Sequence, residues 1–254
     1  MHYCRSFRIY AILLLAFSIA SCSSGYNVVR SNRSDYSINR DLLPDSNIIR
    51  KYLPYKAKLD AEMSQVIGHS AVLMSKKSSD TLPESLLSNF FSDAVLQQAL
   101  KMDANIDFAL PSTKGGLRVD LPKGNITVSN VFELMPFENE LVIFNVKGTE
   151  VKSILNFIAS TNGQPVSRLK MKIRNKTAVD VLINGKPLNP DKTYRILTSD
   201  YIGGGGDNVP VFKGINEKKV LGLKIRDALL NHIKETEAQG KTLNPELDGR
   251  ITKA

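Results

Sequence analysis

Three loops combine glycine with a charged or aromatic residue, a combination suited to binding a small ligand. They are PSTKGGLR (111–118), PFEN (136–139) and DYIGGGGDN (200–208). In the first loop, Arg118 offers a planar guanidinium for an anion. In the second, Phe137 follows a proline at a turn and precedes an apolar strand, and in the third, four glycines separate Tyr201 from Asp207. The residue types therefore suggest an anion contact and flat stacking surfaces.

Each loop also has a purely structural interpretation. Adjacent glycines commonly form a tight turn that allows close backbone approach, and an arginine after a turn is commonly solvated. Phe137 is either a lid over the core or a platform for a flat ligand, and residue type alone favours the lid. The glycines concerned are Gly115, Gly116, Gly203, Gly204, Gly205 and Gly206.

The spacing of apolar residues predicts the elements that must position these loops. We expect helices over 52–68, 84–102, 128–134, 149–160 and 221–240. We expect strands over 70–76, 106–112 and 141–146, and a β-hairpin over 177–202 that turns at Asn184-Gly185. Because helices and strands mix without a regular βαβ alternation, the fold class is predicted to be α+β.

The N-terminus has the pattern of a secretory signal. Arg5 and Arg8 precede an apolar segment, 9–19, that is short for a membrane span. The next residues, 19–22, resemble the lipobox of bacterial lipoproteins, in which Cys22 carries lipid. The alternative is an uncleaved signal anchor.

These features predict a division of the chain into three parts. Residues 1–21 would be the signal peptide, residues 22–50 a lipidated tether, and residues 51–254 the folded domain. Because Ser23-Ser24-Gly25 carries no acidic cluster, we expect the protein in the bacterial cell envelope, facing the periplasm.

The charge of the chain limits its partners. The formal net charge is +9, and it is +7 after removal of residues 1–21. The basic residues are scattered and are not interleaved with aromatic residues, which argues against nucleic-acid binding. A positive field still favours phosphorylated small molecules.

The ordered motifs resemble the C-terminal, substrate-binding domain of the 5'-nucleotidase family. The resemblance rests on GGLR, VFELMPFENELV with KGTEVKSIL, and the Tyr201–Asp207 loop, in that order. ESLLSNFFSDAV resembles the family's opening helix and ELDGRI its closing strand, so the similarity covers roughly residues 55–253. The resemblance implies a four-layer α/β/β/α domain that grips the nucleoside, while a separate N-terminal domain holds two metal ions and cleaves the phosphate ester.

The resemblance also gives each loop residue a role. Phe137 and Tyr201 match the two aromatic residues that sandwich the base, and Asp207 matches the acid that accepts hydrogen bonds from ribose hydroxyls. Arg118 matches an arginine directed at the phosphates, and Asn139 matches a polar contact on the base side. The glycines of the third loop would bring its aromatic ring and its acid to opposite sides of one nucleoside.

Three positions depart from the family pattern. Thr113 occupies the place of a family asparagine, and Pro83 falls near the place of a second arginine. These two departures remove polar contacts, so we expect weaker binding or a changed base preference. Tyr201 stands where the family usually has phenylalanine, which is a milder change because the aromatic ring is kept.

The chain has few residues for catalysis of its own. Its three histidines are His2, His69 and His232, the last two expected at the surface, and it has no G-x-S-x-G motif. We therefore expect no metal site here, and the resemblance implies two divalent metals on a partner phosphatase chain. The predicted function is the nucleotide- or nucleoside-recognition domain of a split 5'-nucleotidase-type hydrolase, inactive on its own. The alternatives are a stand-alone nucleotide-binding lipoprotein and a structural relic whose aromatic residues have become core or interface residues.

Overall fold

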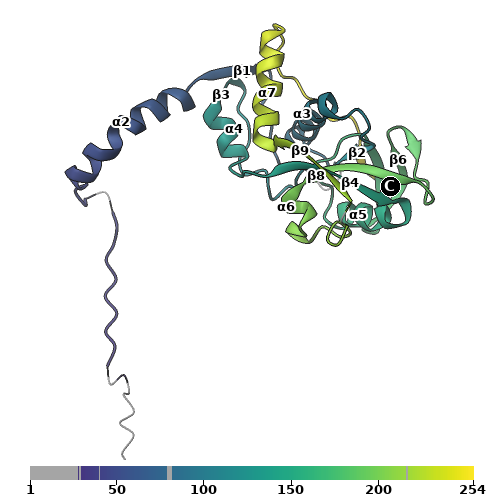
Figure 1. Ribbon diagram of the computed structural model, residues 1–254, viewed down its shortest axis with the longest axis horizontal. Coiled ribbons are helices and arrows are strands. Elements are labelled where there is room, and N and C mark those ends of the chain that lie inside the picture. The colour runs from purple at the N-terminus through teal and green to yellow at the C-terminus, as the bar shows by residue number, and fades with distance from the viewer. Residues whose placement is uncertain (1–27, 29, 40, 79–81, 216) are drawn as a thin grey trace, which may run out of the picture. The chain divides into compact units, whose positions relative to one another are not determined.

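The computed structural model describes residues 28, 30–39, 41–78, 82–215 and 217–254 (Figure 1). The chain separates into two compact units, 1–50 and 51–254. The predicted signal peptide and Cys22 lie outside the described residues. Among the helices that the structure does describe, none combines the length and apolar character needed to span a bilayer.

Helix α2 (Ser46–Met63) has no buried residue. It begins before the expected start at 52 because Asp45 accepts a hydrogen bond from the Asn47 backbone N–H at 2.7 Å. It ends at Met63 rather than at Gly68, which lies in strand β1 (Val66–Ser70). The last five residues of the predicted tether are therefore helical.

A four-stranded sheet forms the centre of the second unit. Its order is β2 (Phe108–Ala109), β8 (Thr193–Ser199), β4 (Glu140–Lys147) and β9 (Lys218–Lys224). Strand β4 runs antiparallel to both β8 and β9, whereas β2 runs parallel to β8. The apolar run of β4 is continuous because both faces of the strand are covered.

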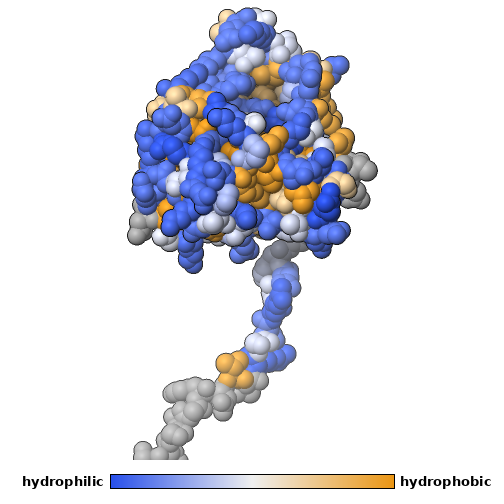
Figure 2. Space-filling model, turned by 90° about the vertical axis from the view of Figure 1, so that its right-hand side faces the viewer, coloured by the Kyte–Doolittle hydropathy of each residue, from blue (hydrophilic) through white to orange (hydrophobic). Residues whose placement is uncertain are grey.

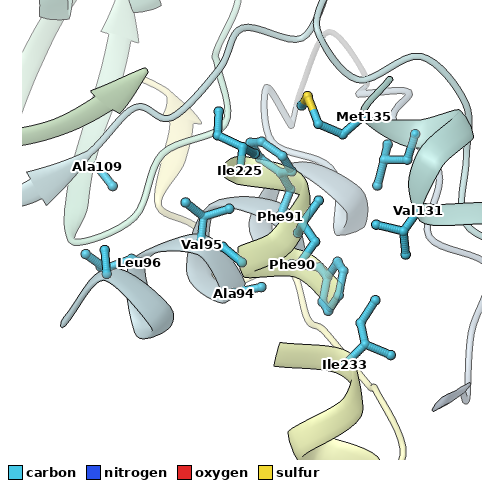
Figure 3. Close-up of a cluster of buried hydrophobic side chains, with 14 of the residues drawn as sticks. Phe90, Phe91, Ala94, Val95, Leu96, Ala109, Val131, Met135, Ile225 and Ile233 are labelled. Carbon is cyan, nitrogen blue, oxygen red and sulfur yellow. The ribbon is translucent and has the colours of Figure 1, made fainter. Parts of the chain in front are cut away.

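One face of the central sheet packs against helices. These are α3 (Leu86–Met102), α4 (Val128–Leu134) and α7 (Ile225–Ala238), accompanied by the pair of β1 with β3 (Gly124–Thr127). Figure 3 shows part of this core, where Phe90 and Phe91 of α3 lie near Val131 of α4 and Ile225 of α7. Leu141 and Ile143 of β4 belong to the same core.

The other face packs against α5 (Gly148–Ser160) and a second sheet. The order of this sheet is β10 (Ile251–Lys253), β5 (Leu169–Arg174), β6 (Thr177–Ile183) and β7 (Lys186–Pro187). Val142, Phe144 and Val146 of β4 contribute to this second core. The arrangement is the predicted α+β sandwich of two sheets with helices. The face in Figure 2 is mostly hydrophilic, with a group of hydrophobic residues near its centre.

Helix starts follow the capping residues. Helix α3 begins at Leu86 rather than at Glu84 because the Ser85 hydroxyl accepts a hydrogen bond from the Ser88 N–H at 3.1 Å. Helix α4 begins after Thr127, as expected, since Thr127 and Asn130 form a capping box. The expected strand 106–112 is reduced to β2.

Three predictions from periodicity were wrong. Strand β6 does turn at Asn184-Gly185, but it pairs with the short β7, while β8 joins the central sheet beside β4. The helix expected from Leu221 begins at Ile225, because the preceding residues pair with β4 as strand β9. The strand expected over 70–76 is absent beyond Ser70, the last residue of β1, and the rest of this segment makes an isolated bridge from Met74 to Leu121.

Candidate functional site

Three loops that are far apart in sequence meet at one end of the strands of the central sheet. The first loop follows β2 and the third follows β8, and because these two strands are parallel, both loops lie at the same end. The PFEN turn precedes β4, which is antiparallel to β8, and therefore lies at that end as well. The sheet topology thus brings the three loops together.

A cavity of about 190 Å³ lies between these loops. All five residues predicted to bind substrate are in its wall, together with three residues of the first loop. The lining residues are Ser112, Gly115, Gly116, Arg118, Phe137, Asn139, Tyr201 and Asp207.

Phe137 is not a buried lid on the core, because it lines this cavity with 37% of its surface exposed, and its ring can therefore serve as a platform for a flat ligand. The turn that carries it is held from α7: the buried Arg226 guanidinium donates to the Phe137 carbonyl at 3.3 Å and also to the Glu138 carboxylate. The same guanidinium lies 4.2 Å from the centre of the Phe132 ring. Hydrogen bonds from Lys224 and then Arg226 lower the pKa of Glu138 to about 2. The turn is therefore fixed by charged contacts below the exposed ring.

Arg118 stands beside this platform. Its guanidinium carbon is 5.9 Å from the centre of the Phe137 ring, and its Nη1 donates to the Gly115 carbonyl at 3.1 Å. The Arg118 backbone N–H donates to the Leu134 carbonyl at 3.0 Å. A cation beside an aromatic face can contact the anionic part of a ligand whose flat part stacks on the ring.

Tyr201 lies on the first turn of α6 (Asp200–Gly203), and 49% of its surface is exposed. Its ring packs against Gly206 so closely that a Cβ on this glycine would lie 2.5 Å from a ring carbon. Its hydroxyl donates to Oδ1 of Asp207 at 2.9 Å, and this hydrogen bond raises the pKa of the Tyr201 phenol. The glycines therefore let the loop fold back onto its own aromatic ring.

Asp207 is held from two sides. Its backbone has φ of 52°, in the left-handed region that few non-glycine residues occupy. Its Oδ2 accepts a hydrogen bond from the hydroxyl of Thr113. The side chain of Asp207 thus joins the first loop to the third.

Thr113 is the site residue whose role the sequence did not show. It was recognised only as a departure from the family pattern, yet it is buried and contacts Asp207. Its neighbour Lys114 anchors the first loop by donating to the carbonyls of Thr161 and Asn162, at 3.2 and 2.8 Å. Burial lowers the pKa of Lys114. No sequence signal linked position 113 to position 207, because the contact depends on the sheet topology.

The other departure that removes a polar contact, at Pro83, lies outside the cavity wall. Pro83 packs against Gly163, where an added Cβ would lie 2.3 Å from the Pro83 carbonyl oxygen. Pro83 is not among the residues that line the cavity.

A larger open cavity, about 460 Å³, lies between α3, the second sheet and the C-terminal segment. Its half-buried cation, Arg250, already binds the carboxylates of Asp93 and Asp248, each at 2.8 Å. The smaller cavity is the better candidate site because it contains half-exposed aromatic rings.

His69 and His232 do not line the cavity of the candidate site. His69 is exposed and lies 3.0 Å from Glu237, whereas His232 is half-buried with its ring 5.8 Å from that of Phe90. The expectation that both are surface residues was thus wrong for His232. Within the described residues, no three His, Cys, Asp or Glu side chains are grouped so that they could hold a metal ion.

Comparison with known proteins identifies the family of this chain. The family described as "5'-nucleotidase, C-terminal domain" matches residues 66–214. Protein UshA of Yersinia enterocolitica is 29% identical in an alignment 180 residues long that covers 67% of this chain and 31% of UshA. The trifunctional nucleotide phosphoesterase protein YfkN of Bacillus subtilis is 26% identical in an alignment 219 residues long that covers 78% of this chain and 14% of YfkN.

A solved structure shows the same fold. The 5'-nucleotidase precursor of Thermus thermophilus superposes with a TM-score of 0.66 at 27% identity, over 83% of this chain and 44% of that one. The chain belongs to the 5'-nucleotidase C-terminal domain family. It spans less than half the length of these relatives.

Proposed function

We propose that this chain is the nucleotide- or nucleoside-recognition part of a 5'-nucleotidase-type hydrolase and works with a separate metallophosphatase chain. The observation that carries the proposal is the meeting of Phe137, Tyr201, Arg118, Asn139 and Asp207 in one cavity. Two half-exposed aromatic rings suit a base, and an arginine beside one of them suits a phosphate.

Stacking supplies much of the binding free energy in this proposal. A base against one aromatic ring contributes about 1–3 kcal/mol. Before a ligand arrives, Arg226 holds the backbone that carries the Phe137 ring, and Asp207 holds the Tyr201 ring through its hydroxyl. Fixed rings lose little conformational entropy on binding, which favours affinity.

The second chain would supply the catalytic metals. Two divalent ions would activate water and stabilise charge on the phosphate, while this chain would hold the nucleoside in position. The lengths of the relatives support the proposal, since each has a large region beyond the part that matches this chain.

Helix α2 offers a surface for such a chain. Ile48, Tyr52, Tyr55 and Leu59 follow one another at spacings of four, three and four residues and form one apolar stripe, here called the α2 stripe. Their exposed fractions run from 45% to 78%. We propose that the α2 stripe contacts the partner chain. We further propose that lipid on Cys22 holds the protein in the cell envelope.

Phosphate release from AMP tests the function. The assay uses the chain from Ser23 to Ala254, a metallophosphatase chain from the same cell envelope, and their mixture, each with manganese or zinc. We expect no release by this chain alone and at least about tenfold higher efficiency for the mixture than for the phosphatase alone. Release by this chain alone that survives repurification would contradict the proposal. Nucleotide binding without any gain in the mixture would favour a stand-alone binding protein.

A further inference from the structure

Two departures from the family pattern meet at one carboxylate of the site. Thr113 stands in place of an asparagine and Tyr201 in place of a phenylalanine, and each donates its hydroxyl hydrogen to a different oxygen of Asp207. Among the residues that line the cavity, Asp207 is the one with a carboxylate. Both oxygens that could accept from a ligand diol thus already have donors from the protein.

We propose that Thr113 and Tyr201 make this site insensitive to the 2'-hydroxyl of its ligand, so that ribonucleosides and 2'-deoxyribonucleosides bind with nearly equal affinity. The inference deepens the proposed function and rests on it. It concerns the class of nucleoside that the same cavity accepts.

The energetic reason is that a ligand hydroxyl gains little at an occupied acceptor. Exchanging one hydrogen bond for another changes the free energy little, because the displaced donor must find a new partner. Thr113 is only 4% exposed, so its hydroxyl would lose its partner in a place that water hardly reaches. If the ligand hydroxyl instead adds a third hydrogen bond to the carboxylate, it gains little binding free energy, because the carboxylate charge is already shared between the hydroxyls of Thr113 and Tyr201.

The same contacts stabilise the empty site. The Tyr201 hydrogen bond spans a loop in which Asp207 has a positive φ, and the Tyr201 ring rests on Gly206. The carboxylate therefore serves to hold the stacking ring in place. The site then recognises its ligand less by the sugar than by the base, which stacks on the aromatic rings, and by the phosphate, which contacts Arg118.

Calorimetric titration with adenosine and with 2'-deoxyadenosine tests this inference. For the wild-type chain we expect dissociation constants within about threefold of each other. Thr113→Val keeps the side-chain shape and frees Oδ2, and Tyr201→Phe keeps the ring and frees Oδ1. In the double variant we expect adenosine to bind at least about tenfold tighter than 2'-deoxyadenosine, because a diol can then use both oxygens.

Controls separate this effect from general damage to the fold. Thr252→Val removes a hydroxyl from β10, and Tyr36→Phe removes one from the N-terminal unit; both should keep the wild-type ratio. The single variants should each show an intermediate ratio, so the inference does not depend on the double variant alone. Wild-type preference for adenosine of tenfold or more, or an unchanged ratio in every variant, would overturn it. Failure of the wild type to bind either nucleoside would instead overturn the proposed function on which it rests.

Discussion

Tyr201 and Gly206 show how closely single residues determine this site. The ring of Tyr201 fills the space that a side chain at position 206 would need. In that position its hydroxyl donates a hydrogen bond to Asp207. The stacking surface therefore depends on a residue that has no side chain to contact the ligand.

Gly206→Ala should weaken nucleoside binding by about tenfold, because the new Cβ, 2.5 Å from the ring, must displace Tyr201 from its stacking position. Calorimetry with adenosine measures the change. Gly204→Ala is the matched control, since Gly204 has φ of −78° and a Cβ there would lie 3.3 Å from its nearest neighbour. Equal affinities of the two variants would show that the position of the Tyr201 ring does not matter.

At the scale of elements, α7 controls the turn before β4. Arg226, on the first turn of α7, donates to Glu138 and to the carbonyl of Phe137. Lys224, the residue before α7, also binds the Glu138 carboxylate. A helix start thus fixes the aromatic platform.

Glu138→Gln should lower the free energy of unfolding at pH 7, because it leaves the buried Arg226 without its anionic partner. Since the pKa of Glu138 falls from 4.5 to about 2 on folding, its stabilising effect is present above pH 4.5 and is lost as the pH falls toward 2. The difference between wild type and variant should therefore shrink over that range. Urea unfolding at pH 7, 4.5 and 2.5 measures it, and a difference that does not change with pH would contradict this account.

The α2 stripe gives a second prediction at this scale. Leu59→Asp should remove the gain in phosphate release that the mixture with a metallophosphatase shows, because a charge would enter an apolar contact. Adenosine affinity should be unchanged, since no residue of α2 lines the cavity. Lys58→Asp changes the neighbouring exposed position, outside the α2 stripe, and serves as the control that should keep the gain. If Lys58→Asp lost the gain and Leu59→Asp kept it, the partner chain would not contact the α2 stripe.

The types of most elements, and five of the residues that line the cavity, could be predicted from the sequence, whereas the pairing of the strands could not. The stripe of Leu221, Ile225 and Leu229 does face one core, but Leu221 reaches it from strand β9 and the other two from α7. The spacing of apolar residues indicates which residues are buried, but it does not distinguish one long helix from a strand that is followed directly by a helix. For the same reason the partner of β8 and the contact of Thr113 with Asp207 needed the three-dimensional arrangement.

At the scale of the whole molecule, two hydrophobic cores lie on opposite faces of one sheet, and the candidate site lies at one end of the strands of that sheet. The rigid sheet positions the three loops relative to one another. Loss of the helical core should therefore affect the site even though no residue of α3 lines the cavity.

His232 makes the folding stability of this core depend on pH. Burial lowers the pKa of His232 in the folded protein below its ordinary 6.5. The unfolded chain then binds more protons than the folded chain below pH 6.5, so folding stability falls as the pH decreases from about 6.5. His232→Gln should reduce this dependence, as measured by urea unfolding at pH 7.5 and 5.5. An identical pH dependence in wild type and variant would show that His232 does not contribute.

The central claim is that the cavity between Phe137 and Tyr201 binds a nucleoside. Calorimetric titration of the chain from Ser23 to Ala254 with adenosine, AMP and inorganic phosphate tests it most directly. We expect saturable binding of adenosine and AMP that Phe137→Ala weakens by about tenfold or more, and that Tyr36→Ala leaves unchanged. No heat of binding at millimolar adenosine or AMP, or equal binding by wild type and Phe137→Ala, would contradict the account.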